Sequence, residues 1–336
     1  MKICVCGGGS LGTVCAGVFS SIDNVEVNLL TQRPEKWLRT IKVTDLNNKI
    51  FEGELNIISN KPETAIEGCD IILLCLPGYL IEETLMKIRP YLNDNTVIGS
   101  IVSSTGFFFQ AHSILSEKAK LFGFQRVPFI SRVLEYGYEA ALLGYKPSLN
   151  IAVENIENIE EFKGLIEKLF LTPVNILNNF YEACLTNSNP ILHTGRLYSM
   201  WHNWSGEAIT NCSLFYKDWD DSSSQIIIDM DQEFMKLLSH LPVDKKQIPP
   251  LLDYYESYDA ISLTKKISSI PAFQNILSPM KETDKGWIPD FGSRYFTEDF
   301  PFGLFYIKKL AEKYGISTPV IDKVYNWGMS KIKDFI

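Results

Sequence analysis

The residues best suited to chemistry lie near the carboxyl end of the chain, in the stretch 288–301. This stretch places the guanidinium of Arg294 and the carboxylate of Asp299 among aromatic side chains and between two prolines. We expect a loop-like segment here, and packing alone does not explain so many ionisable groups in it. Arg294 is suited to bidentate binding of a carboxylate. The alternative is a structural arginine that bridges helices through Asp290 or Glu298.

One of the four histidines is a candidate for proton transfer. His193 follows the asparagine-rich residues 187–190, near an expected domain junction. A histidine can supply or remove the proton that accompanies hydride transfer to a C=O or C=N group, and a carboxylate can fix its tautomer. Asp299 is the preferred partner because Pro301 constrains the chain beside it, and Glu298 is the alternative. The residues alone also allow a core histidine at position 193. We interpret His112 and His240 as structural, and the role of His202 stays open.

A glycine-rich motif at the other end of the chain predicts a nucleotide site. Residues 7–12 fit G-x-G-x-x-G, in which the three glycines allow a tight turn, approach of a pyrophosphate and close helix packing. The motif follows a predicted strand at 2–6 and opens a predicted helix at 10–21, which is the context that it requires. A glycine-rich turn without a ligand is the alternative. We predict that the phosphates contact the start of this helix, at Gly7, Gly9, Ser10, Leu11 and Gly12.

Two further positions are candidates for coenzyme contacts. The end of the second strand should reach the adenosine ribose, where an acid favours NAD and an arginine favours the 2′-phosphate of NADP. The sequence there is Thr31-Gln32-Arg33, without an acid, so Arg33 slightly favours NADP but does not decide between the coenzymes. A solvated surface arginine is the alternative. Pro77 ends the apolar run 70–76 and is predicted to line the nicotinamide side, unless it is an ordinary strand stop.

Alternating strands and helices predict the fold class of the first half of the chain. Strands are expected at 2–6, 25–30, 70–76, 96–102, 119–127 and 149–154, with a hairpin over 42–58 that turns at Asn47-Asn48. This order predicts a mostly parallel, doubly wound (Rossmann) α/β domain, residues 1–180. After residue 178 the helical periods lengthen, as at 229–239 and 302–314, and strand-like runs are nearly absent. We therefore expect a mainly α-helical domain over residues 181–336.

Composition restricts the class of protein further. The chain has 336 residues, 46% hydrophobic and 21% charged, which is typical of a soluble protein with two domains. Its net charge of −8 argues against nucleic acid or a membrane surface as a partner. No apolar run reaches the roughly 20 residues of a membrane helix. Seven scattered cysteines without a C-x-x-C pair favour a reducing, cytoplasmic setting and no bound metal.

At these motifs the chain resembles the octopine/nopaline (opine) dehydrogenase family. The resemblance is carried by residues 289–301 (PDFGSRYFTEDFP), residues 314–319 (YGISTP), the glycine motif, residues 214–216 (LFY) and His193. It implies a nicotinamide coenzyme, NAD or NADP, that reduces the imine formed from an amino acid and a 2-keto acid. It also implies His193 and Asp299 as the catalytic pair and Arg294 as the carboxylate-binding residue. We expect the amino acid and the 2-keto acid to be its partners, and we expect the protein to be a monomer or a homodimer.

Two other functions remain open from the sequence. A ketopantoate-reductase-like 2-keto acid reductase needs a lysine early in the second domain, and residues 186–204 contain none. A non-catalytic dinucleotide-binding sensor would bind the coenzyme without turnover. Residues 125–132 bear on the substrate, because they carry Arg126 and Arg132 and no acid. If they line the amino-acid pocket they repel a guanidinium group, so we do not expect arginine as the substrate.

Overall fold

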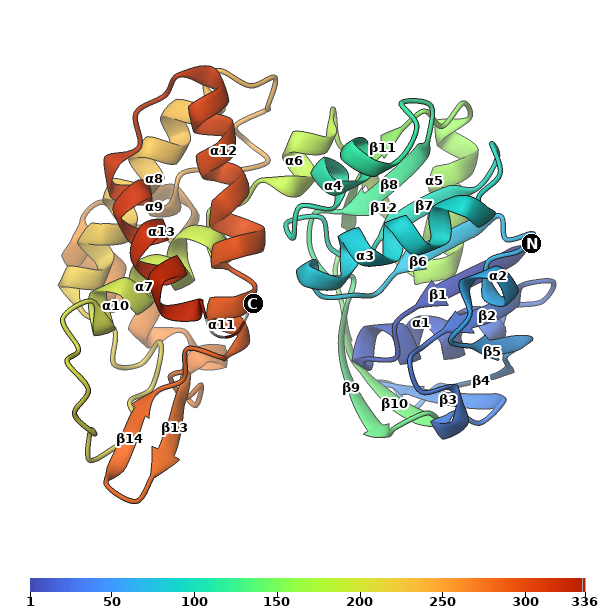
Figure 1. Cartoon of the computed structure of the whole chain (residues 1–336), viewed down its shortest axis with the longest axis horizontal. Helices are drawn as coiled ribbons and strands as arrows, with labels where there is room; N and C mark the ends of the chain where they lie inside the picture. Colours follow the sequence, from blue (N-terminus) through green and yellow to red (C-terminus); the bar gives the residue numbers. More distant parts are fainter. Residues whose placement is uncertain (334, 336) are drawn as a thin grey trace. The chain divides into compact units, whose positions relative to one another are not determined.

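The computed structural model describes residues 1–333 and 335 and divides into two compact units, Met1–Cys184 and Leu185–Ile336 (Figure 1). The boundary expected after residue 180 falls inside α6 (Phe180–Cys184), the last helix of the first unit. None of the helices in the described part of the chain combines the length and the apolar character needed to span a bilayer.

The first unit is built on an eight-stranded sheet with the strand order β12-β11-β8-β7-β6-β1-β2-β5. All neighbouring strands in it run parallel except β8 and β11, which are antiparallel. The doubly wound fold class predicted from the sequence is confirmed. The strands are β1 (Lys2–Cys6), β2 (Glu26–Leu30), β5 (Ile57–Ser59), β6 (Ile71–Leu74), β7 (Val97–Ser100), β8 (Lys120–Phe124), β11 (Leu149–Glu154) and β12 (Val174–Ile176).

Helices cover both faces of this sheet, because its central strands are apolar on both sides. Along β1, Ile3 and Val5 pack with α1 and α5, whereas Cys4 and Cys6 pack with α2, α3 and α4 on the opposite face. This alternation follows from the two-residue period of a strand. The helices are α1 (Ser10–Ser20), α2 (Pro62–Ala65), α3 (Gly78–Ile88), α4 (Phe107–Ile114) and α5 (Ile159–Phe170), with short 3₁₀ turns at Pro34–Lys36 and Arg89–Tyr91.

A second, four-stranded sheet packs against the outer side of α1. Its strand order is β4-β3-β10-β9, and the predicted hairpin turn is present, with Asn48 at a φ of 60°. The prediction was wrong in two respects, because residues 57–59 join the large sheet as β5 and because the β9–β10 hairpin was not expected. The strands are β3 (Thr40–Asp45), β4 (Ile50–Glu54), β9 (Phe129–Glu135) and β10 (Glu139–Tyr145).

The second unit is mainly helical, as predicted. Its central helix is α8, which contacts α7, α10, α12 and α13. The expectation of few strands misses one antiparallel hairpin, β13 (Met280–Thr283) and β14 (Gly286–Pro289). The other elements are η3 (Ser188–His193), α7 (Thr194–Trp201), α8 (Asp221–Leu238), α9 (Leu251–Tyr254), α10 (Ala260–Ser269), η4 (Pro271–Phe273), α11 (Arg294–Thr297), η5 (Phe300–Leu304), α12 (Phe305–Tyr314) and α13 (Pro319–Ile332).

Two buried carboxylates on α8 bind neighbouring segments of the second unit. Glu233 accepts hydrogen bonds of 2.9 Å from the backbone N–H groups of Val320 and Ile321, in the first turn of α13. A carboxylate at this end of a helix satisfies free donors and complements the helix dipole. Asp231 accepts from the side chain of Asn187 at 2.9 Å and from the backbone N–H of Leu251 at 2.8 Å.

Asp231 should make the stability of the protein depend on pH. Burial raises the pKa of Asp231 to about 6, against hydrogen bonds that lower it. The folded state therefore holds this proton more tightly than the unfolded chain, and the free energy of unfolding should fall as the pH rises from about 4 to about 6. At about 1.4 kcal/mol per pKa unit the loss is on the order of 3 kcal/mol.

Urea unfolding at a series of pH values measures this effect in the natural protein and in Asp231→Asn. Between about pH 4 and about pH 6, the unfolding free energy of the natural protein should fall relative to that of Asp231→Asn. Asp229→Asn, a more exposed carboxylate on the same helix, is the matched control. Parallel curves for the natural protein and Asp231→Asn would contradict the prediction.

Candidate active site

The glycine motif has the close contacts that its three glycines are expected to allow. Gly7 joins β1 to the start of α1 with a φ of 111°, a conformation that favours glycine. A Cβ on Gly12 would lie 2.0 Å from the carbonyl oxygen of Gly7, so a side chain there would separate helix from strand. A Cβ on Gly9 would meet nothing within 4 Å, so there is open space over this residue.

The start of α1 offers hydrogen-bond donors to a phosphate. Gly9 is the N-cap of α1 and provides no side-chain cap, and the first turn carries no acidic residue. The first-turn N–H groups, at Ser10, Leu11 and Gly12, thus suit a phosphate group. The Ser10 hydroxyl accepts a 3.2 Å hydrogen bond from the backbone N–H of Val133, which leaves its own proton for an acceptor. These residues fit a dinucleotide pyrophosphate.

The other predicted coenzyme residues lie at the same edge of the sheet as the glycine motif. β6, β1 and β2 are parallel neighbours, and Pro77, Gly7 and Arg33 follow their carboxyl ends. Ligands of doubly wound folds bind at this edge. The Arg33 side chain is exposed and makes no ion pair within the described residues. Pro77 is the N-cap of α3.

The structure brings His193 and Asp299 together, although 106 residues separate them in the sequence. Nδ1 of His193 lies 2.8 Å from Oδ2 of Asp299, and the side chains are 12% and 15% exposed. A carboxylate only accepts hydrogen bonds, so in the neutral imidazole the proton lies on Nδ1 and the lone pair on Nε2. The carboxylate at Nδ1 is thus that of Asp299, and the rival, Glu298, is a buried residue.

Two π-helical turns position this pair. His193 ends η3, and Asp299 is the N-cap of η5. The turns pack against each other, and a Cβ on Gly303 would lie 3.0 Å from the ring of Pro190. Such turns are rare and often occur at functional sites. The expectation of a loop-like segment over 288–301 was wrong, because β14, α11 and the start of η5 occupy most of it.

The structure adds one residue that sequence reasoning did not place in the site. The hydroxyl of Tyr216 lies 2.8 Å from Nε2 of His193, so both ring nitrogens have partners. Burial raises the pKa of Tyr216 far above its usual value, and Tyr295, Tyr255 and Asp299 add to this effect. Tyr216 therefore stays a neutral phenol. Its position in the sequence motif 214–216 was the available signal, but that motif indicated no role for it.

Arg294 lies at the start of a short helix of the second unit. It is the first residue of α11, its side chain is exposed, and it forms no ion pair with any described residue. The structure therefore does not show the bridge through Asp290 or Glu298 that was the alternative interpretation. Tyr295, the next residue, contacts the imidazole of His193 with ring centroids 4.9 Å apart.

The other three histidines have local partners. His112 lies 2.7 Å from the carboxylate of Glu154, through its Nε2 atom. His202 stacks on the ring of Tyr198 at 4.6 Å. His240 contacts the carbonyl oxygen of Lys236 at the end of α8.

Two protein-family models match the chain. Residues 176–332 match the α-helical domain of NAD/NADP octopine/nopaline dehydrogenase. Residues 3–106 match the model for ketopantoate reductase PanE/ApbA. The second match is confined to the doubly wound unit, whereas the first covers the unit that contains His193, Arg294 and Asp299.

Similar proteins align over nearly the whole chain. An opine dehydrogenase of Haliotis discus hannai is 29% identical over 361 residues, which cover 97% of this chain and 89% of that protein. An octopine dehydrogenase of Mizuhopecten yessoensis is 27% identical, with 99% and 90% covered. A solved structure of octopine dehydrogenase with NADH and L-arginine superposes with a TM-score of 0.87 at 26% identity, over 99% of this chain and 89% of that one.

A doubly wound unit with a glycine fingerprint and a helical unit with a histidine–carboxylate pair define an NAD(P)-dependent oxidoreductase that acts on CH–NH groups. Within that class, the family-model match over residues 176–332, the two relatives and the solved structure support the octopine/opine dehydrogenase family. The comparisons do not favour the two other functions, a 2-keto acid reductase or a sensor without turnover.

Proposed function

We propose that His193 and Asp299 form the acid–base centre of the opine-type reaction that this chain carries out. That reaction is the reductive condensation of an amino acid with a 2-keto acid, and its reverse. The observation that carries the proposal is the 2.8 Å contact between Nδ1 of His193 and Asp299. It leaves Nε2 as the nitrogen that exchanges a proton with the substrate.

The first unit is proposed to hold the coenzyme and the second to supply the acid–base groups. Gly7, Gly9 and Gly12 would admit the pyrophosphate to the backbone, and Ser10 and Leu11 would donate hydrogen bonds to it. Pro77, after β6, would line the nicotinamide side. When bound, the coenzyme supplies a hydride to the imine carbon.

The proton steps belong to the dyad. The protonated imidazole of His193 would donate from Nε2 to the departing hydroxyl or to the imine nitrogen. Asp299 stabilises the cation before that step and holds Nδ1–H after it, so that the ring keeps one orientation. In the reverse direction the neutral imidazole removes a proton through the same nitrogen. Low exposure of both side chains strengthens their attraction, because little water competes for them.

Arg294 is proposed to bind the carboxylate of the keto acid. Its exposed guanidinium has no ion-pair partner among the described residues, and its planar donors match a carboxylate. Holding the acid in one orientation contributes to catalysis by positioning.

Arg33 is proposed to let the enzyme accept NADPH. It follows β2, where an acidic residue would repel the 2′-phosphate, and its side chain is exposed. All seven cysteines are free thiols, which supports a reducing, cytoplasmic setting.

A crossed panel of amino acids and 2-keto acids, assayed with NADH and with NADPH, tests the proposed function. Oxidation of the coenzyme should require both substrates together. His193→Ala should abolish it, and Asp299→Asn should lower kcat by roughly 10²- to 10⁴-fold, because the imidazole loses its orientation and its countercharge. Coenzyme affinity, measured by fluorescence titration, should stay unchanged in both variants.

His202→Ala, which removes another histidine of the same unit, is the control for the dyad and should retain turnover. Full turnover by His193→Ala would rule out the assigned acid–base centre.

Replacing Arg294 with glutamine should raise KM for the keto acid by roughly 10- to 100-fold, the size of a lost charge-assisted hydrogen bond. Because the side chain is exposed and has no ion-pair partner among the described residues, thermal stability should not change. Steady-state kinetics with the keto acid varied at saturating amino acid measures the effect. Lys285→Gln removes an exposed cation from the same unit and should leave KM unaltered. An unchanged KM in Arg294→Gln would contradict the assignment.

Arg33→Glu should lower the ratio of kcat/KM for NADPH to that for NADH by about 10-fold or more, because a carboxylate would repel the 2′-phosphate. The ratio is measured at fixed amino acid and keto acid. Lys36→Glu places the same charge on a nearby exposed residue and is the control. An equal change of this ratio in both variants would contradict a specific contact between Arg33 and the 2′-phosphate, because any added surface charge would then have the same effect.

A further inference from the structure

The imidazole of His193 is held at both nitrogens, and the second partner has no role in the reaction described above. Asp299 lies 2.8 Å from Nδ1 and the Tyr216 hydroxyl 2.8 Å from Nε2. Nε2 is the nitrogen that the proposed function uses. The hydroxyl is therefore in direct contact with the atom that gives and takes the proton.

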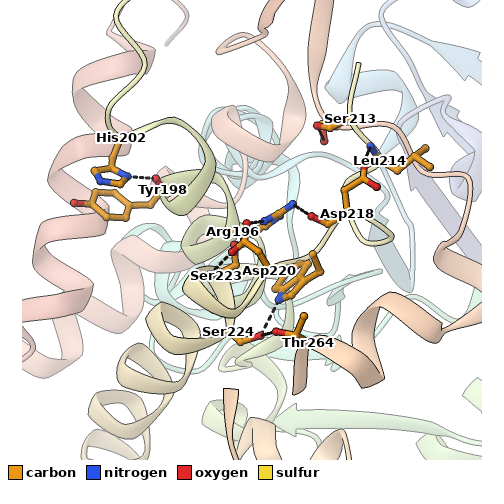
Figure 2. Close-up of polar contacts among 12 residues, drawn as sticks. Arg196, Tyr198, His202, Ser213, Leu214, Asp218, Asp220, Ser223, Ser224 and Thr264 are labelled. Carbon is orange, nitrogen blue, oxygen red and sulfur yellow. Dashed lines mark hydrogen bonds and ion pairs between the residues drawn. The ribbon is translucent and has the colours of Figure 1, made fainter. Parts of the chain in front are cut away.

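The loop that carries Tyr216 is fixed by the buried Arg196 of α7 (Figure 2). Nη2 of Arg196 donates to the carbonyl oxygen of Asp218 at 2.6 Å, and Nη1 donates to Asp220 and to Ser223 at 2.7 Å each. The carboxylate of Asp218 accepts a 2.8 Å bond from the backbone N–H of Leu214 and so closes the loop. Arg196 lies one turn after His193. The same short helix therefore carries the imidazole at its start and fixes the loop through Arg196.

The ring of Tyr216 is also fixed by aromatic neighbours. Phe273 stacks on it with ring centroids 4.3 Å apart, and Trp219 lies nearly parallel to it at 6.0 Å and 7°. Trp219 is itself held, because its indole N–H donates to Ser224 and its ring lies under the guanidinium of Arg196. A phenol confined in this way presents its hydroxyl at one place.

We propose that Tyr216 is a positioning residue of the dyad, which aims Nε2 of His193 and keeps a hydrogen bond to that nitrogen in both of its protonation states. In the neutral imidazole the hydroxyl donates to the lone pair of Nε2; when Nε2 is protonated, the same oxygen accepts from it. The phenol changes only the direction of its O–H bond. This inference rests on the proposed acid–base role of His193.

Both partners of the imidazole stabilise the cation more than the neutral ring. The carboxylate on Nδ1 is a countercharge, and the bond that the Tyr216 oxygen accepts from a cationic Nε2–H is charge-assisted, so it is stronger than the bond that the hydroxyl donates to the neutral ring. The titratable groups that face the imidazole are Asp299, Tyr216 and Tyr295, and Tyr255 faces Tyr216. Removal of the neutral Tyr216 hydroxyl therefore destabilises the cation more than it destabilises the neutral ring.

The test is Tyr216→Phe, which keeps the stacked ring and removes one oxygen. The alkaline half-maximal point of kcat/KM for reductive condensation should move to lower pH by about half a unit to one unit, because the hydrogen bond lost from the cation is stronger than the one lost from the neutral ring. kcat should fall by roughly 10-fold because the imidazole is less well aimed, while KM for the coenzyme stays unchanged. Tyr198→Phe removes a hydroxyl without a hydrogen-bond partner within the described part of the unit and should leave the profile unaltered.

A second readout needs neither coenzyme nor turnover. In protein labelled with ¹⁵N-histidine, the Nε2 resonance of His193 at alkaline pH should report a hydrogen-bonded lone pair, and it should move in Tyr216→Phe but not in Tyr198→Phe. His193→Gln assigns the signal. An unmoved resonance together with an unmoved pH profile overturns the inference.

The remaining outcomes separate this inference from the proposed function. If His193→Ala is inactive and Tyr216→Phe behaves as the natural enzyme, only the role of Tyr216 fails. If His193→Ala keeps its turnover, the proposed acid–base centre fails, whatever Tyr216 does. If Tyr216→Phe is as inactive as His193→Ala, the tyrosine hydroxyl itself is the proton donor, and the positioning role is overturned.

Discussion

The hydrogen bond between His193 and Asp299 is the interaction on which the rest of the site depends. It forms because two π-helical turns pack closely, with Gly303 against Pro190. A regular α-helical turn would place each residue at a different angle around its axis, and a bulkier residue at position 303 would force the turns apart. The chemistry of the second unit thus follows from an irregular backbone, which is more costly than a regular helix and is maintained by packing around it.

The two units meet opposite physical demands. At the coenzyme edge of the sheet, the chain leaves backbone groups accessible through glycine and an uncapped helix start, because an anion must approach them. Around His193 the chain does the reverse: Phe215, Tyr216 and Tyr295 enclose the imidazole with their rings. Enclosure keeps water from the dyad and strengthens each of its hydrogen bonds.

The sequence was informative where chemistry depends on short patterns. The glycine motif and the apolar parallel strands could be recognised from residue types and their order, and these signals together with the family resemblance made His193, Arg294 and Asp299 candidates. The β9–β10 and β13–β14 hairpins could not, because their strands are short and pair outside the large sheet. Tyr216 also escaped prediction, because its contact with Nε2 depends on Arg196, Trp219 and the loop between them. Such a contact has no local signature.

The arrangement of the dyad extends to α8, and this explains why that helix carries two buried carboxylates. Asp231 binds Asn187, the N-cap of η3, which ends at His193. Glu233 binds the start of α13, whose Gly328 lies against the ring of Phe300 in η5. Residues two apart on a helix point to different sides, so one helix can hold the supports of both π turns. Polar capping thereby fixes a geometry that apolar packing, which lacks direction, would leave less defined.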